Sequence, residues 1–231
     1  RLAALELSKL HHVSVFEADD EHALNSAGKV AAAMLAPLAE SVLCEADLAQ
    51  MGLDSINRWP QIIEELDHDV FFQQQGTLVV AHQQDKGDLQ SFTQRIKPVA
   101  GHSAQALNAQ QIAQLEPELA NRFSQGVFLP CEGQIDNQAF YKASFTLLNK
   151  RKVKFVFNQR VTIKNGEINN RPFDFIIDCR GLGAKAGQPL RGVRGEVARL
   201  YAPEVNLTRP VRLMHPRYPI YIAPKPNNEY V

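Results

Sequence analysis

Several residues with potential chemical roles lie at or just after the ends of predicted strands: a carboxylate, two glycines and a run of small residues. Glu17 ends the apolar stretch "VSVFE", and Gly181 and Gly183 follow the stretch "FDFIIDCRG". In an open α/β sheet, ligands bind beyond the carboxyl ends of the strands, so these groups are predicted to gather at one sheet edge. There a carboxylate can accept both ribose hydroxyls of an adenine dinucleotide, while glycines let backbone N–H groups approach the ligand.

Each of these signals also has a purely structural explanation. A glutamate at a strand end is commonly solvated, glycines after a strand commonly form a turn, and "SAGKVAAAMLAP" suits close packing as well as flat-ring binding. Tyr221 alternates with Ile220 and Ile222, which places it on the opposite strand face. If the isoleucines face the core, the tyrosine faces a cleft or solvent.

The elements that must position these residues follow from apolar periodicity and end signals. Asn108 with Gln111 predicts a capping box, Asp136 predicts a helix start, and Asn165-Gly166 predicts a hairpin turn. Helices are expected over residues 2–7, 44–66, 87–96, 108–115 and 137–152. Strands are expected over 13–17, on both sides of Gly76, and over 126–130, 153–161 and 173–181, with a strand-and-turn pattern from Gly195 onward.

Composition excludes several classes of function. The 231 residues are 45% hydrophobic, and 25 basic residues balance 25 acidic ones, so no global charge recruits nucleic acid or anionic lipid. Three distant cysteines without a CxxC pair argue against a disulfide framework or a zinc site and favour a reducing cytoplasm. No apolar run approaches the roughly 20 residues that span a bilayer. Neither a metal nor a membrane partner is expected.

The order of the elements predicts two interleaved domains and an α/β fold class, α+β overall. Residues 1–66 and 127–190 resemble pieces of a nucleotide-binding Rossmann-like domain. Residues 67–126 and 191–231 are expected to form a second, mixed-sheet domain.

Several stretches carry a specific resemblance. "VSVFEADD", "NSAGKVAAAMLAPLAE", "GTLVVAH", "IIDCRGLGA", "VRGEVARLYAP" and above all "RPVRLMHPRYPIYIAPKPNNEYV" occur in order along the chain. Together they resemble the FAD-dependent glycine oxidases of bacterial thiamine biosynthesis, within the D-amino-acid oxidase family. That family has a first strand and a GxGxxG turn before a helix like "RLAALELS", and it continues past the equivalent of Val231. The resemblance therefore implies an internal portion of a flavoprotein, inactive and weak in FAD binding by itself.

The resemblance implies roles residue by residue. Tyr221 corresponds to the active-site tyrosine, and Val161 to the residue whose backbone pairs with adenine. Glu17 would bind the adenosine ribose with Ala18 beside it, whereas "GK" at Gly28 and Lys29 departs from the usual form of the following loop. The remaining implied FAD contacts are Ser26, Ala27, Ala33, Met34, Leu35, Cys179, Arg180, Gly181 and Gly183.

The implied activity is oxidation of glycine or a small amino acid by FAD, with dioxygen as electron acceptor, peroxide release and a product for thiazole synthesis. The flavin supplies the difficult step, so no side chain has to act as a strong base. A related flavin dehydrogenase or N-methyl amino-acid oxidase, and a non-enzymatic homologue that binds a partner, remain alternatives. Homo-oligomerisation is left open.

Overall fold

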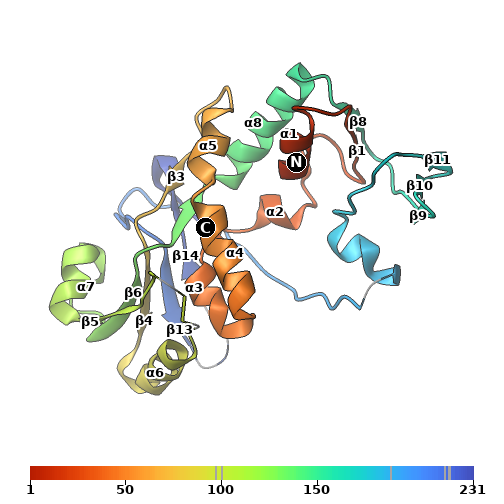
Figure 1. Ribbon diagram of the computed structural model, residues 1–231. Coiled ribbons are helices and arrows are strands. Elements are labelled where there is room, and N and C mark those ends of the chain that lie inside the picture. The colour runs from red at the N-terminus through yellow and green to blue at the C-terminus, as the bar shows by residue number, and fades with distance from the viewer. Residues whose placement is uncertain (97, 100, 188, 216, 218–219) are drawn as a thin grey trace. The chain divides into compact units, whose positions relative to one another are not determined.

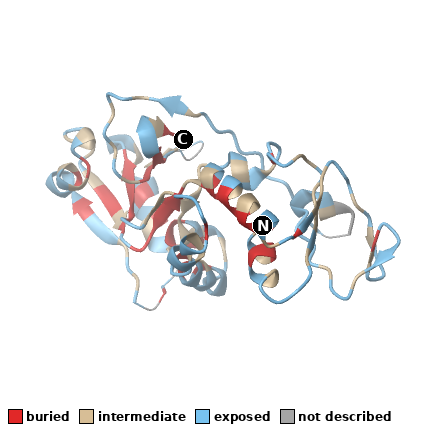
Figure 2. Ribbon diagram, turned by 90° about the horizontal axis from the view of Figure 1, so that it is seen from above, coloured by how far each residue is buried: buried red, intermediate tan, exposed pale blue. Residues whose placement is uncertain are grey.

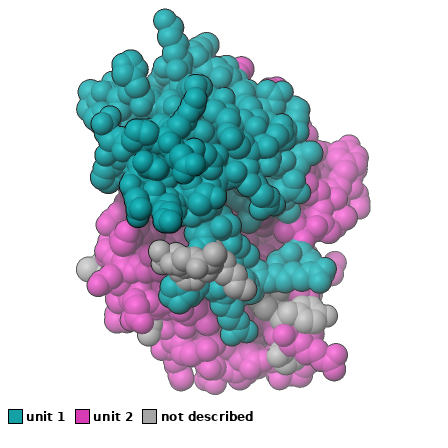
Figure 3. Space-filling view, turned by 90° about the vertical axis from the view of Figure 1, so that its right-hand side faces the viewer, with its two compact units in different colours: residues 1–30, 144–196 teal, residues 31–143, 197–231 magenta. Residues whose placement is uncertain are grey.

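The chain forms two compact units in a computed structural model, which describes every residue except 97, 100, 188, 216, 218 and 219 and the side chains of 185–187. The first unit comprises residues 1–30 and 144–196, and the second comprises residues 31–143 and 197–231. Figure 1 labels the elements and Figure 3 colours the two units. Part of the quoted motif "HPRYPIYIAP", at residues 216, 218 and 219, lies outside the described residues.

The first unit is built on a parallel pair of short strands. β1 (Ser14–Phe16) pairs in parallel with β8 (Lys154–Val156), which follows α8 (Asn137–Lys150). Helix α1 (Leu2–Leu7) buries Ala4 and Leu5, and the Leu5 carbonyl accepts a hydrogen bond from Arg151 at 2.8 Å. The predicted opening helix and strand are thus confirmed. The other elements of this unit are α2 (Ala27–Val30), β9 (Ile163–Lys164), β10 (Glu167–Ile168), β11 (Arg171–Pro172) and the 3-10 segment Gly181–Gly187.

The Asn165-Gly166 turn is confirmed as a hairpin. It joins β9 to β10, which pair antiparallel, and both turn residues have positive φ, 52° and 78°. Two successive left-handed residues match the right-handed twist of the flanking strands, and Asn-Gly adopts them with little strain.

The prediction of a buried strand over residues 173–181 is wrong. Residues 173–180 pair with no strand among the described residues, and Phe175 and Ile177 are 81% and 49% exposed. An apolar run becomes a buried strand only where neighbouring strands take up its backbone hydrogen bonds. Among the described residues, the parallel sheet of this unit contains only β1 and β8, so the apolar composition of residues 173–181 was not enough to make them a buried strand.

The second unit centres on a five-stranded sheet in the order β14-β13-β4-β6-β5. All five residues of β4 are buried, and Figure 2 shows buried strand segments of the second unit in red. Val79 and Ala81 pack on one face with Leu53, Phe92 and Leu129, while Leu78 and Val80 pack on the other with Ile112 and Val211. The strands are β4 (Thr77–Ala81), β5 (Gln105–Asn108), β6 (Gln125–Leu129), β13 (Val211–Met214) and β14 (Ile220–Ile222).

Two smaller sheets complete the second unit. One has the order β2-β7-β3, from Met34–Leu35, Gly133–Ile135 and Phe72–Gln73, and the other has the order β12-β16-β15, from Leu200–Tyr201, Glu229–Tyr230 and Pro224–Lys225. The strands predicted on both sides of Gly76 are therefore confirmed as β3 and β4. This alternation of helices with several sheets confirms the α/β class.

The single helix predicted over residues 44–66 is two helices. α4 (Ala46–Ile56) ends at Asn57, and α5 (Trp59–Glu64) begins with Pro60 in its first turn. Proline lacks the N–H that a continuous helix would need there, so the helix restarts. The other helices are α3 (Pro37–Glu40), α6 (Lys86–Arg95) and α7 (Ala109–Leu115), with 3-10 turns at Ser41–Leu43, Gln83–Asp85, Pro117–Leu119 and Pro226–Asn228.

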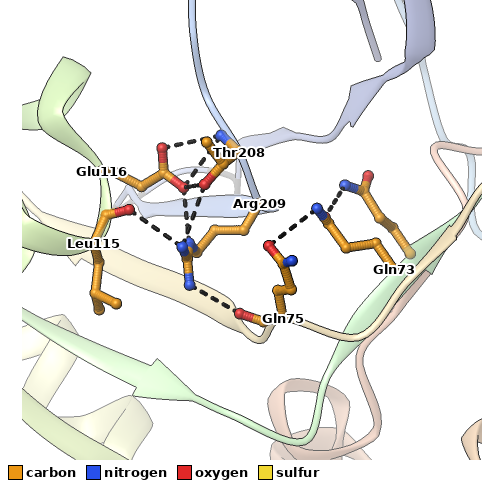
Figure 4. Close-up of polar contacts among 7 residues, drawn as sticks. Gln73, Gln75, Leu115, Glu116, Thr208 and Arg209 are labelled. Atoms are coloured by element: carbon orange, nitrogen blue, oxygen red, sulfur yellow. Dashed lines mark hydrogen bonds and ion pairs between the residues drawn. The ribbon is translucent and has the colours of Figure 1, made fainter.

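A buried ion pair fixes the approach to β13. The Glu116 side chain is fully buried, and its Oε1 lies 2.8 Å from Arg209 Nε. Thr208 donates its backbone N–H to the same carboxylate at 3.0 Å, and Arg209 also donates to the carbonyl of Gln75 at 2.9 Å (Figure 4). Because each charged group has several partners, this pair holds the 208–209 segment in place.

Candidate functional site

Glu17 lies at the carboxyl end of β1 and is half-buried. Its Oε1 accepts a hydrogen bond from the backbone N–H of Asp19 at 3.1 Å, and its carbonyl accepts one from Gln159 at 3.0 Å. A carboxylate offers about four lone-pair positions, so Glu17 keeps capacity for further donors. Ala18 beside it is exposed.

Val161 and Arg180 are brought together in the first unit. Arg180 Nη1 donates to the Val161 carbonyl at 3.2 Å, while its other nitrogens bind Asp178, with Nη2 2.7 Å from Oδ2. These hydrogen bonds lower the pKa of Asp178 to about 2. The Glu17 carbonyl accepts the N–H of Gln159, so Glu17 and Arg180 both contact the 159–161 segment that follows β8.

The glycines of the 181–183 segment differ in what they require. Gly181 has a φ of +54°, and a Cβ there would meet nothing within 4 Å. Its requirement is therefore the left-handed backbone rather than space. A Cβ on Gly183 would lie 3.2 Å from that of Arg180.

The small-residue stretch is divided between the two units. In the first unit, the carbonyl of Ser26 accepts the N–H groups of Lys29 and Val30 at the start of α2, where Ala27 is exposed. In the second unit, Ala33 has a φ of +55° and precedes β2, and its carbonyl accepts from Ile135 at 3.1 Å. A left-handed alanine costs about 1–2 kcal/mol, strain of the kind that clusters at functional segments.

Met34 and Leu35 form β2 and lie against β7, in register with Gln134 and Gly133. Gln134 is fully buried and accepts a hydrogen bond from Lys225, whose Nζ also donates to the carbonyl of Ile135 at 2.9 Å. Burial lowers the pKa of Lys225 to about 8. A cation therefore lies on the Met34 side of this sheet, because directly opposed residues share a face.

Glu132 lies just before β7 and is fully buried. Its Oε1 accepts the N–H of Ala39 at 2.7 Å, inside the short helix α3. Burial raises the pKa of Glu132 to about 7, against the opposing effect of the backbone donors of Ala39 and Leu38. This carboxyl anchors the helix that follows the Ala33–Leu35 segment.

Tyr221 is half-buried in β14, directly opposite Arg212 of β13. Ile220 and Ile222 are the more exposed residues of this strand, at 38% and 40%. The isoleucines thus do not face the main core, and Tyr221 lies on the sheet face that carries Phe92, against the Arg212 guanidinium. Burial raises the pKa of the Tyr221 phenol, although Arg212 acts in the opposite direction.

A family comparison covers almost the whole chain. The family model described as DAO, FAD-dependent oxidoreductase, matches residues 2–231. This chain belongs to the DAO family of FAD-dependent oxidoreductases. The resemblance seen in the sequence is therefore confirmed at the level of the family, and so is FAD as the family's cofactor.

Individual proteins similar to this DAO-family chain share about a third of its residues or fewer. A Rhizobium etli oxidoreductase named for thiamine biosynthesis, ThiO, is 32% identical over 202 residues, which are 87% of this chain and 57% of ThiO. The fold resembles glycine oxidase from Geobacillus kaustophilus, with a TM-score of 0.74 and 19% identity over 98% of this chain and 65% of that one. The fold also resembles iminodiacetate oxidase from Chelativorans sp., with a TM-score of 0.69 and 19% identity over 99% of this chain and 66% of that one.

The chemistry of the residues present fits FAD. The Glu17 carboxylate has acceptor capacity for ribose hydroxyls, and the exposed loop at 179–183 of the same unit offers backbone groups. In the second unit, the strained backbone at Ala33 leads into half-buried Met34 and Leu35.

Three residues around these segments escaped the sequence analysis: Arg212, Glu132 and Lys225. Each is a charged side chain inside or directly beside an apolar strand, in "PVRLM", "FLPCEGQI" and "IYIAPK". A charge in such a position is seldom fully buried without a partner, so this pattern was the available signal. Among the described residues, no group of three or more His, Cys, Asp or Glu side chains is placed to hold a metal ion.

Proposed function

We propose that the protein is an FAD-dependent oxidase of glycine or a similarly small amino acid, whose product feeds thiazole and thiamine synthesis. The 32% identity to ThiO and the likeness to glycine oxidases support this proposal. The observation that carries it is half-buried Tyr221, a hydroxyl donor that lies beside the Arg212 guanidinium on a sheet face whose other described side chains are largely apolar. Such a donor suits the carboxylate of a substrate too small to offer other contacts.

The residue roles belong to the same proposal. Glu17 binds the adenosine ribose with Ala18 beside it, and Val161 meets adenine through its backbone. Tyr221 donates to the substrate carboxylate and orients the α C–H. When bound, FAD supplies the two-electron acceptor for that C–H bond. The remaining residues proposed to line FAD are Ser26, Ala27, Ala33, Met34, Leu35, Cys179, Arg180, Gly181 and Gly183.

The proposal also assigns the domain roles, the electron acceptor and the cellular location. We assign FAD binding to residues 1–66 and 127–190 and substrate binding to 67–126 and 191–231. Dioxygen is the proposed electron acceptor, with release of hydrogen peroxide. The cytoplasm is the proposed location, which suits the three unpaired cysteines Cys44, Cys131 and Cys179. No helix among the described residues is long and apolar enough to cross a membrane.

Peroxide release tests the proposed function. The full-length protein supplied with FAD is mixed with glycine, sarcosine or D-alanine in air, and peroxide is measured with a peroxidase-coupled dye. We expect glycine to give the highest kcat/KM. Turnover of glycine only with an artificial acceptor would indicate a dehydrogenase, and preference for sarcosine would indicate an N-methyl amino-acid oxidase. FAD binding without turnover of any amine would contradict an enzymatic role.

A further inference from the structure

Arg212 is a buried cation in the middle of an apolar sheet face. Its side chain is only 6% exposed, and in β13 it stands in register with Val79 of β4 and Tyr221 of β14. Directly opposed residues project from the same face of a sheet. The guanidinium is therefore on the face shared by Tyr221 and the packed core.

Two aromatic rings and one carboxylate surround this guanidinium. Its Cζ lies 4.9 Å from the ring centre of Phe92 and 5.0 Å from that of Tyr221, and Nη1 lies 3.3 Å from Glu40 Oε1. Glu40 is itself half-exposed, and Arg212 Nε has no hydrogen-bond partner among the described residues. A buried charge with so few partners contributes little to stability. Stability therefore does not account for the presence of Arg212 at this position, and its contact with Tyr221 calls for another role.

The geometry points to Arg212 as a positioning residue that restrains the Tyr221 ring so that its hydroxyl meets the substrate carboxylate. A planar guanidinium against the face of the ring limits its rotation more than an alkyl side chain does. Phe92 on α6 and Glu40 on α3 hold the guanidinium in turn. This inference rests on the proposed function, since it gives Tyr221 a substrate to meet.

Steady-state kinetics of the full-length protein with FAD test the coupling between the two residues. Arg212→Met is expected to raise KM for glycine about fivefold with kcat within about twofold, since the hydroxyl is still present but less well aligned. In a Tyr221→Phe background, Arg212→Met should add no further rise. Arg212→Lys, which keeps a cation near the ring, should restore part of the loss. The matched control is Arg199→Met, which removes an arginine paired to Glu229.

An equal rise in KM from Arg212→Met with and without the Tyr221 hydroxyl would overturn the inference. So would an equal effect of Arg199→Met. A fall in kcat with unchanged KM would also contradict it, because the role assigned to Arg212 concerns substrate binding.

Fluorine NMR separates this inference from the proposed function. In protein labelled with 3-fluorotyrosine, the resonance absent from Tyr221→Phe belongs to Tyr221. Arg212→Met should shift and broaden that resonance, while Arg199→Met should leave it in place. An unchanged resonance would overturn the restraint of Tyr221 by Arg212. A wild-type protein that oxidises no amine would instead overturn the proposed function, whatever the resonance does.

Discussion

At the scale of single residues, Glu17 offers a direct test of FAD binding. Glu17→Ala removes a carboxylate proposed to accept ribose hydroxyls, and charge-assisted hydrogen bonds of this kind contribute about 1.5–3 kcal/mol. The Kd for FAD should therefore rise by about ten- to a hundredfold, while turnover at saturating FAD persists. Titration of the full-length apoprotein with FAD measures this. Glu21→Ala, an exposed carboxylate in the same loop, is the control. Equal affinities in both variants would leave Glu17 as a surface residue.

Tyr221 tests substrate binding in the same way. In the full-length protein, Tyr221→Phe removes one hydroxyl that we propose contacts the substrate carboxylate in ground state and transition state alike. KM for glycine should rise about tenfold, the scale of one hydrogen bond near 1.4 kcal/mol, with little change in kcat. Tyr201→Phe, which alters a tyrosine 74% exposed, is the matched control for peroxide kinetics. An unaltered KM would remove Tyr221 from the site.

Glu132 is expected to make stability depend on pH. Its pKa is about 7 in the folded chain against 4.5 for a free carboxyl, so the folded state holds the proton more tightly. The contribution of Glu132 to the free energy of unfolding should be full below pH 4.5. It should decline as the pH rises through about 7, by roughly 3 kcal/mol in all. Denaturant unfolding at pH 5 and pH 8 measures this decline.

Glu132→Gln should remove most of that decline, since the amide keeps an acceptor for Ala39 without a charge to bury. Glu45→Gln, an exposed carboxylate, should leave it unchanged. A wild-type protein equally stable at the two pH values would show that Glu132 does not titrate in this range.

At the scale of elements, local signals predicted local structure. The capping box at Asn108 and Gln111, the Asp136 helix start and the Asn165-Gly166 hairpin all depend on hydrogen bonds within a few residues, and all three are present. The 173–181 strand was wrong because a strand depends on partners distant in sequence. The same reason hid the pairing of Arg212 with Tyr221, which only the β13–β14 register reveals.

The capping box gives a prediction for α7. The Asn108 side chain accepts from the backbone of Gln111 at 2.9 Å, and the Gln111 side chain accepts from the backbone of Asn108 at 2.9 Å. Asn108→Ala should lower the free energy of unfolding by about 1 kcal/mol, whereas Asn108→Ser should retain most of it. Denaturant titration distinguishes them. Equal losses in both variants would mean that side-chain volume, rather than the cap, stabilises this turn.

At the scale of the whole molecule, burial is unevenly distributed along the chain. The second unit contains a strand, β4, with every residue buried, whereas residues 174–179 of the first unit are almost entirely exposed. The chain also passes between the units three times, near residues 30, 143 and 196. Neither unit is thus a single continuous stretch of sequence, and local opening should follow burial rather than position along the chain.

Hydrogen exchange measured by mass spectrometry tests this distribution in the chain of residues 1–231. Amides of β4 are hydrogen-bonded on both sides, to β6 and β13, so they should exchange only through global unfolding. Peptides covering 174–179 should exchange on the order of a thousandfold faster, because their amides lack ladder partners. The exposed loop 20–25 supplies a fast-exchanging reference. Protection of 174–179 comparable to that of β4 would show that this apolar segment pairs as a strand in solution, as its sequence predicted.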